Sequence, residues 1–254
     1  SQPHRPCYTP ELLRELRMYQ HKLMAQIDND EIAPTKYFVL ASSLPGVFNL
    51  GGDLEFFVKA IKSGDETGLC AYARACVDAI YPFATGLHQR TTTMALVQGD
   101  ALGGGFEAAL AANVLVAERS AKLGLPEVLF NLFPGMGAYQ FLSRKIAPHM
   151  AEKMIMSGKL YSAEELFEMG VVDILAEDGQ GELAVYEYIR EARRHANTYA
   201  AMREVAACCH PLDYDELIRV TDIWVEAALR LTDRDLRMMK RLATRQIQRS
   251  AEAA

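Results

Sequence analysis

The sequence of 254 residues lacks any apolar run approaching the roughly 18–20 residues that a membrane span needs. The segment 1–16 also lacks the apolar core of a secretory signal. An excess of basic residues is missing too, since 27 Lys and Arg against 33 Asp and Glu give a net charge of −6. That balance disfavours a globally basic nucleic-acid binder. We therefore expect a soluble, cytoplasmic protein.

Cysteine is scarce and scattered, with five residues and no C-x-x-C pair. This pattern predicts neither a disulfide framework nor a zinc site, and we expect small, reduced core thiols instead. The adjacent pair Cys208 and Cys209 beside His210 lacks a second pair of ligands nearby. We expect no metal and no separate cofactor.

Several catalytic motifs are absent as well. The sequence contains no G-x-S-x-G turn and no Walker pattern, and its glycine triplet is not followed by the Rossmann spacing. The histidines show neither metal-ligand nor triad spacing. These absences disfavour a serine nucleophile and a nucleotide-binding protein.

What is present is typical of a globular protein, with 50% hydrophobic and 24% charged residues. Short apolar runs predict strands that alternate with helices up to about residue 180, and only helices after it. We therefore predict an α/β core over 1–180 and a C-terminal helical subdomain over 181–254. The expected strands are 37–41, which we expect to be buried, 93–97, 113–117 and 171–175. The expected helices are 11–27, 54–62, 70–80 with an interruption near Pro82, 137–146, 148–157, one from Ser162 to about Gly170 opened by a capping box with Glu165, and one that begins at Thr232 with Asp235.

Residues 93–127 carry the most informative pattern. An apolar strand runs into Gly103, Gly104 and Gly105, and a helix follows at once. Glycines allow a close backbone approach to a ligand, and free N–H groups at a helix start stabilise negative charge. Glu107 lies one turn inside that helix. Taken alone, three glycines before a helix more often serve packing.

Two further segments strengthen the chemical interpretation. The segment 47–54, VFNLGGDL, is a second glycine turn between a strand and a helix. Glu127 lies between Pro126 and an apolar run, so we expect it to be partly desolvated, with a pKa raised toward the neutral range. Two carboxyls and two glycine turns suit proton transfer next to an oxyanion.

These segments resemble the crotonase (enoyl-CoA hydratase/isomerase) superfamily over roughly residues 10–180. The motifs are FNLGGDL (48–54), QGDALGGGFEAAL (98–110) and GLPEV…FPGMG (124–137). The resemblance implies a crotonase-like ββα spiral core. It also implies that the N–H groups of Gly52 and Gly104 form the oxyanion hole and that Glu107 and Glu127 are the acid and base. Members of this superfamily usually begin with a β-hairpin of about 25 residues, which is absent here before RPCYTPELLREL.

A narrower resemblance, to the diffusible-signal-factor synthases of Gram-negative bacteria, also includes LYSAEEL and TDIWVEAA (221–228). It implies a dehydratase and thioesterase that converts a 3-hydroxyacyl-acyl carrier protein into a free cis-2-enoic acid used in quorum sensing. It also implies docking of a sensor-kinase receiver domain, while the broader crotonase resemblance implies homotrimers or hexamers. The residues it places at the substrate are Gly51, Gly103, Gly135, Met136 and Trp224.

Other interpretations remain open at this stage. An ordinary enoyl-CoA hydratase of fatty-acid metabolism has the same fold, with the substrate on CoA instead of acyl carrier protein. A catalytically idle crotonase-fold protein would act as a binding partner. Trp224 is equally well explained as a core residue. A basic last helix suits either a solvated face or contacts with a phosphate or an acidic carrier, through Arg237, Lys240, Arg241, Arg245 and Arg249.

Overall fold

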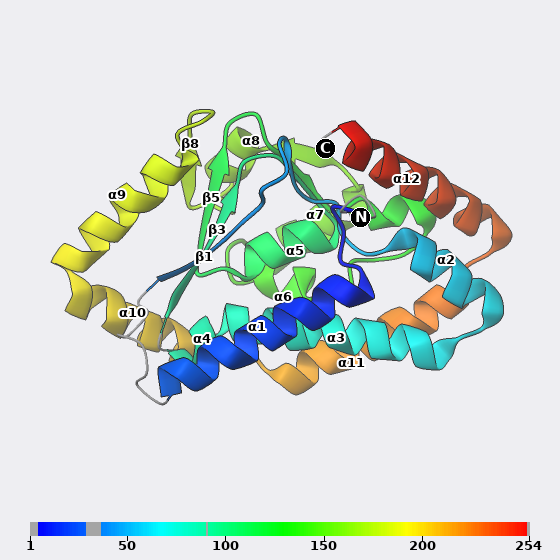
Figure 1. The fold of residues 1–254 in the computed structure, drawn as a ribbon, viewed down its shortest axis with the longest axis horizontal. Coiled ribbons are helices and arrows are strands. Elements are labelled where there is room, and N and C mark those ends of the chain that lie inside the picture. The colour runs from blue at the N-terminus through cyan, green and yellow to red at the C-terminus, as the bar shows by residue number, and fades with distance from the viewer. Residues whose placement is uncertain (1–4, 29–36, 90, 253–254) are drawn as a thin grey trace.

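The computed structural model describes residues 5–28, 37–89 and 91–252, and it is an α/β structure with helices packed around two sheets (Figure 1). The helices are α1 (Pro10–Asp28), α2 (Leu54–Ser63), α3 (Glu66–Ala84), α4 (Gly86–Gln89), α5 (Gly104–Ala111), the 3₁₀ helix η1 (Pro126–Phe130), α6 (Ala138–Leu142), α7 (Pro148–Ser157), α8 (Ala163–Glu168), α9 (Gly181–Arg194), α10 (Ala196–Cys209), α11 (Tyr214–Leu229) and α12 (Asp233–Glu252). The strands are β1 (Tyr37–Ala41), β2 (Val47–Asn49), β3 (Thr92–Val97), β4 (Asp100–Leu102), β5 (Val114–Glu118), β6 (Lys122–Gly124), β7 (Leu160–Ser162) and β8 (Ile174–Ala176). Among the described residues, no helix combines the length and apolarity of a membrane span.

The strands form two sheets, and from β1 to β6 the chain visits them alternately. One sheet has the order β1-β3-β5-β8 and is parallel throughout. The second has the order β2-β4-β6-β7, in which only β7 runs antiparallel. Each of the first three turns of the chain places one strand in each sheet and then forms a helix, as in β1-β2-α2, β3-β4-α5 and β5-β6-η1. This repetition is the predicted ββα spiral.

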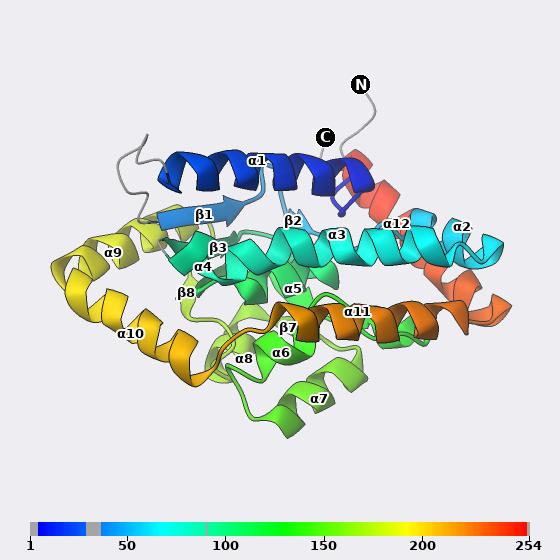
Figure 2. The same cartoon turned by 90° about the horizontal axis from the view of Figure 1, so that it is seen from below.

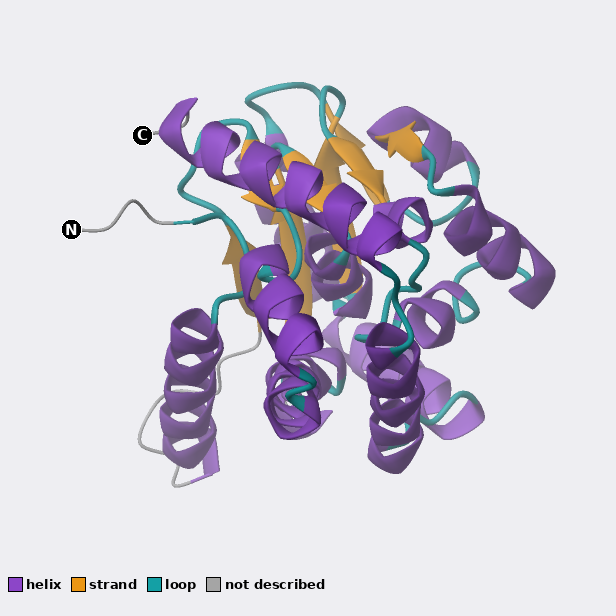
Figure 3. Ribbon diagram, turned by 90° about the vertical axis from the view of Figure 1, so that its right-hand side faces the viewer, coloured by secondary structure: helices purple, strands orange, loops and turns teal. Residues whose placement is uncertain are grey.

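The helices cover the sheets in layers. Helix α3 packs between α1 and α11, and the three run side by side in Figure 2. Helix α9 packs on β3, β5 and β8. Helix α12 packs on both α2 and η1, and in Figure 3 it crosses the face toward the viewer, ending at the C-terminus. The apolar core lies between the second sheet, α3, α5 and α11.

Most predicted elements are confirmed, and the differences have local causes. The strand 37–41 forms but is half-exposed, because β1 lies at the edge of its sheet. Helix α3 continues through Pro82 to Ala84, where Thr85 closes the last turn on the carbonyl of Tyr81. The helix predicted at 137–146 ends at Leu142.

The last strand begins three residues later than predicted. Val171 and Val172 are buried, and their N–H groups close α8 on the carbonyl of Leu166 instead of joining the sheet. The capping box of Ser162 and Glu165 is confirmed. The prediction of core thiols is wrong for Cys208 and Cys209, which are exposed at the end of α10.

Candidate active site

Three turns meet at one edge of the second sheet. Strands β2, β4 and β6 are parallel neighbours, so their carboxyl ends point the same way. The turns that follow them contain Gly51 and Gly52, then Gly103 and Gly104, then Glu127. Segments far apart in sequence therefore converge on one place.

The two glycine turns touch each other. A Cβ built on Gly51 would lie 3.1 Å from the nitrogen of Gly104, and one built on Gly104 would lie 3.6 Å from the nitrogen of Gly52. Gly51 also has a φ of +91°, which favours glycine. Among the described residues, neither the Gly52 N–H nor the Gly104 N–H has a hydrogen-bond acceptor. Two free donors at this spacing suit a developing oxyanion.

Glu107 lies behind this pair, in α5. Its residue surface is only 2% exposed, and its Oε1 accepts hydrogen bonds from the N–H groups of Met136 (2.7 Å) and Ala138 (3.0 Å). Burial raises the pKa of its carboxyl from 4.5 to about 7, and the two N–H donors lower it in part. Burial therefore favours the protonated form of this carboxyl.

Glu127 approaches from η1 on the other side. A Cβ built on Gly103 would lie 2.5 Å from its Oε1, so the carboxyl rests on that glycine. Its Oε2 is out of contact with solvent and has no hydrogen-bond partner within the described part of the chain, although the residue as a whole is half-buried. Burial first, and then the charge of Glu107, raise the pKa of Glu127 to about 8. The expected desolvation of this carboxyl is confirmed.

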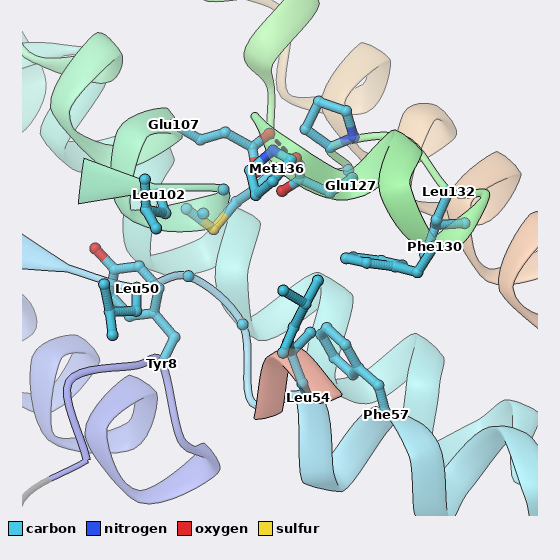
Figure 4. A pocket seen from close by; sticks show the side chains of 18 of the residues that line it. Tyr8, Leu50, Leu54, Phe57, Leu102, Glu107, Glu127, Phe130, Leu132 and Met136 are labelled. Atoms are coloured by element: carbon cyan, nitrogen blue, oxygen red, sulfur yellow. Dashed lines mark hydrogen bonds between the residues drawn. The ribbon is translucent and has the colours of Figure 1, made fainter. Parts of the chain in front are cut away.

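The two carboxyls lie near each other at the wall of one cavity (Figure 4). The cavity has a volume of about 320 Å³. Its wall is mainly apolar, with Leu54 and Phe57 on one side and Phe130 and Leu132 on another. Such a wall, with a few convergent polar groups, suits an apolar ligand with one reactive end.

Trp224 contributes to the same wall from α11. It is 6% exposed, and its ring lies edge-on to Phe57, with 5.0 Å between ring centroids. A Cβ built on Gly135 would lie 2.5 Å from the indole ring, so this glycine lets the segment 133–137 approach the helix. Trp224 is therefore both a core residue and a cavity residue.

The structure brings all of the predicted site residues together on this cavity. They are Gly51, Gly52, Gly103, Gly104, Glu107, Glu127, Gly135, Met136 and Trp224. Of the basic residues of the last helix, Arg245 lines the cavity as well, while Arg237, Lys240 and Arg241 are exposed. The side chain of Arg249 lies outside the described part of the chain. Among the described residues, no group of three or more His, Cys, Asp or Glu side chains is arranged to hold a metal.

Some site residues had no signal in the sequence. The Tyr72 hydroxyl accepts the N–H of Asp53 (3.2 Å) and donates to the carbonyl of Tyr8, which ties the first glycine turn to α3 and to the N-terminal segment. Gln246 reaches the same turn from α12. Both residues lie in helices without a distinctive motif and far in sequence from the glycine turn. No local sequence pattern therefore predicts that they contact it.

The family described as enoyl-CoA hydratase/isomerase matches residues 9–223, and the chain belongs to it. The chain is 32% identical over 188 residues to the fatty acid oxidation complex subunit alpha of Pseudomonas syringae pv. tomato, covering 74% of this chain and 26% of that protein. It is 34% identical over 149 residues to the human mitochondrial methylglutaconyl-CoA hydratase, covering 58% of this chain and 42% of that protein. The chain thus spans less than half the length of these relatives.

Solved structures show the same fold. DspI of Pseudomonas aeruginosa superposes with a TM-score of 0.66 at 25% identity, over 79% of this chain and 71% of that one. An enoyl-CoA hydratase of Bacillus halodurans gives a TM-score of 0.77 at 21% identity, over 95% of this chain and 93% of that one.

Proposed function

We propose that this protein dehydrates a 3-hydroxyacyl thioester carried on acyl carrier protein and then hydrolyses the product, releasing a cis-2-enoic acid as a quorum-sensing signal. The observation that carries the proposal is the pair of free N–H groups, of Gly52 and Gly104, in one cavity with two buried carboxyls. The motif TDIWVEAA supports the narrower reaction, because its Trp224 forms part of the cavity wall.

Dehydration would use all four groups. One ionised glutamate removes the α-proton, and the thioester oxygen becomes an enolate oxygen held by the two N–H groups. The other, protonated glutamate donates its proton to the β-hydroxyl, which leaves as water when the C–O bond breaks. Because the charge of Glu107 raises the pKa of Glu127, the pair suits a state with one proton at neutral pH.

Hydrolysis would reuse the same groups without a separate nucleophile. A carboxylate takes a proton from a water molecule while the oxygen of that water bonds to the thioester carbonyl carbon. The resulting oxyanion is held by the same two N–H groups. When the C–S bond breaks, the thiol leaves with the proton held by the carboxyl, and the free acid remains.

A defined substrate tests the proposal. We would incubate the protein with 3-hydroxydodecanoyl thioesters on acyl carrier protein and on CoA, and resolve cis and trans products by mass spectrometry. We expect free cis-2-enoic acid from the carrier-protein substrate. Glu107→Gln and Glu127→Gln should each lower the rate by about 10²- to 10⁴-fold.

A matched control is Glu118→Gln. Glu118 is also buried, but it accepts hydrogen bonds from Gln98 and the Gly181 N–H away from the cavity, so activity should persist. Reversible formation of trans-2-enoyl-CoA without free acid would make the protein an ordinary enoyl-CoA hydratase. No turnover of either thioester would favour the idle binding protein.

A further inference from the structure

Gln246 connects the last helix to the first glycine turn. Its Nε2 donates to the carbonyl oxygen of Leu50 at 2.7 Å and to that of Gly52 at 3.2 Å. Both carbonyls flank the Gly51–Gly52 peptide, whose N–H is the Gly52 donor. One carboxamide thus holds the backbone on both sides of an oxyanion donor.

This turn has little intrinsic rigidity. Two successive glycines have access to much more of backbone space than other residues. Other contacts hold N–H groups of the turn and its central carbonyl. The Gly51 N–H donates to Asn49 Oδ1 (2.8 Å), and the Gly51 carbonyl accepts the Tyr8 N–H (2.8 Å). At the two ends, the Leu50 N–H donates to the carbonyl of Pro6 and the Asp53 N–H donates to the Tyr72 hydroxyl. Among the described residues, the two flanking carbonyls have no other hydrogen-bond donor than Gln246. Without it, the direction of the Gly52 N–H would be less well fixed.

Gln246 is not what anchors the helix. The face of α12 that packs inward carries Leu236, Met239 and Ala243, which are all buried. Gln246 continues this stripe at the next helical position, where it is half-buried and lines the cavity. The apolar residues should therefore keep α12 docked when the carboxamide is removed.

We propose that Gln246 is a positioning residue, which holds the Gly51–Gly52 turn so that the Gly52 N–H is directed at the substrate oxygen. Placement of that donor then depends on the docking of α12, which also packs on the 3₁₀ helix that carries Glu127. The kinetic consequences of this inference rest on the proposed function. The hydrogen bonds that hold the turn do not depend on it.

Gln246→Met is the decisive variant, because methionine keeps the length and apolar packing of the side chain but cannot donate. We expect kcat to fall by about ten- to a hundredfold, below the usual loss for deleting an oxyanion donor outright, with KM changed by less than about threefold. Gln246→Ala should lose a similar factor. Gln248→Ala, an exposed glutamine on the same helix, is the matched control and should retain activity.

A spectroscopic measurement separates this inference from the proposed reaction. In the Glu107→Gln/Glu127→Gln background, dodecanoyl-CoA labelled with ¹³C at the thioester carbonyl should bind without turnover. We expect binding to lower the carbonyl stretching frequency, and Gln246→Met to remove most of that shift.

The outcomes are distinct. A carbonyl shift that depends on Gln246, in a protein that neither dehydrates nor hydrolyses thioesters, would overturn the proposed function and support the inference. Wild-type kcat and an unchanged shift in Gln246→Met would overturn the inference alone. A bound thioester that shows no shift with Gln246 present would also overturn it.

Discussion

Glu107 lies in a helix, α5, of which every residue is buried, whereas Glu127 lies in a 3₁₀ helix, η1, of which only Phe130 is buried. The first carboxyl has two N–H donors on one oxygen, while the second has an oxygen with no partner. Two groups in one cavity are thus supported in different ways. The core fixes the first, and packing of η1 under α12 holds the second.

This difference separates two jobs that an acid–base pair has to perform. A carboxyl with fixed donors keeps a defined orientation, and its charged form is partly stabilised. A desolvated carboxyl without donors favours its protonated form. The contrast predicts that substitutions that add volume in α5 destabilise the protein strongly. In η1, by contrast, we expect stability to depend mainly on the protonation of Glu127.

The largest effect is expected from Gly105→Ala in α5. A Cβ there would lie 2.1 Å from the carbonyl oxygen of Asn49, which is backbone at the end of β2 and cannot move aside. We expect a loss of about 3 kcal/mol in unfolding free energy and a drop in Tm of about 6–12 °C, measured by calorimetry.

Two variants calibrate that result. Leu129→Ala, in η1, should cost less than about 1 kcal/mol, because this side chain is 54% exposed. In Gly170→Ala the new Cβ meets open space, so any loss of stability comes only from the φ of +78°, which alanine disfavours. If Gly105→Ala were no worse than Leu129→Ala, the contrast between the two regions would be wrong.

An effect that is smaller per pH unit is expected in the pH dependence of stability. Both glutamates have pKa values raised in the folded protein, to about 7 and about 8 from 4.5. The folded state therefore binds these protons more tightly than the unfolded state, and this contribution is complete below pH 4.5 and is lost as pH rises toward 8. Each group contributes a slope of at most about 1.4 kcal/mol per pH unit.

Denaturant unfolding between pH 5 and 8 measures these slopes. The double variant Glu107→Gln/Glu127→Gln should lose less stability across this range than the wild type. Glu127→Gln should remove the larger share, because no N–H of another described residue supports the charged form of Glu127. The two single variants should have similar slopes up to about pH 7, so the total loss of stability between pH 5 and 8 is what distinguishes the two sites. Equal total losses would contradict the difference between them.

The sequence predicts the long elements of the spiral, and every site residue that it predicts lies on the cavity, yet it does not predict the sheet that brings these residues together. Strands β4, β6 and β7 have three residues each, too few for any periodicity to appear. Without them, the approach of Glu127 to Gly103 could be expected only from the family resemblance. Gln246 illustrates a second limit, since its role depends on where α12 docks, almost 200 residues away from the turn.

The smallest effect is expected at Asn131, which ends η1 with a left-handed φ of +61°. Its Nδ2 makes only a long contact, 3.4 Å, with Asp235 of α12. If backbone conformation is what this residue supplies, Asn131→Ala should cost about 1 kcal/mol, because alanine pays for the left-handed region, and Asn131→Gly should be neutral within about 0.5 kcal/mol. Urea unfolding of the two variants decides the point. Equal losses would mean that the contact with α12, and not the turn itself, holds η1 in place.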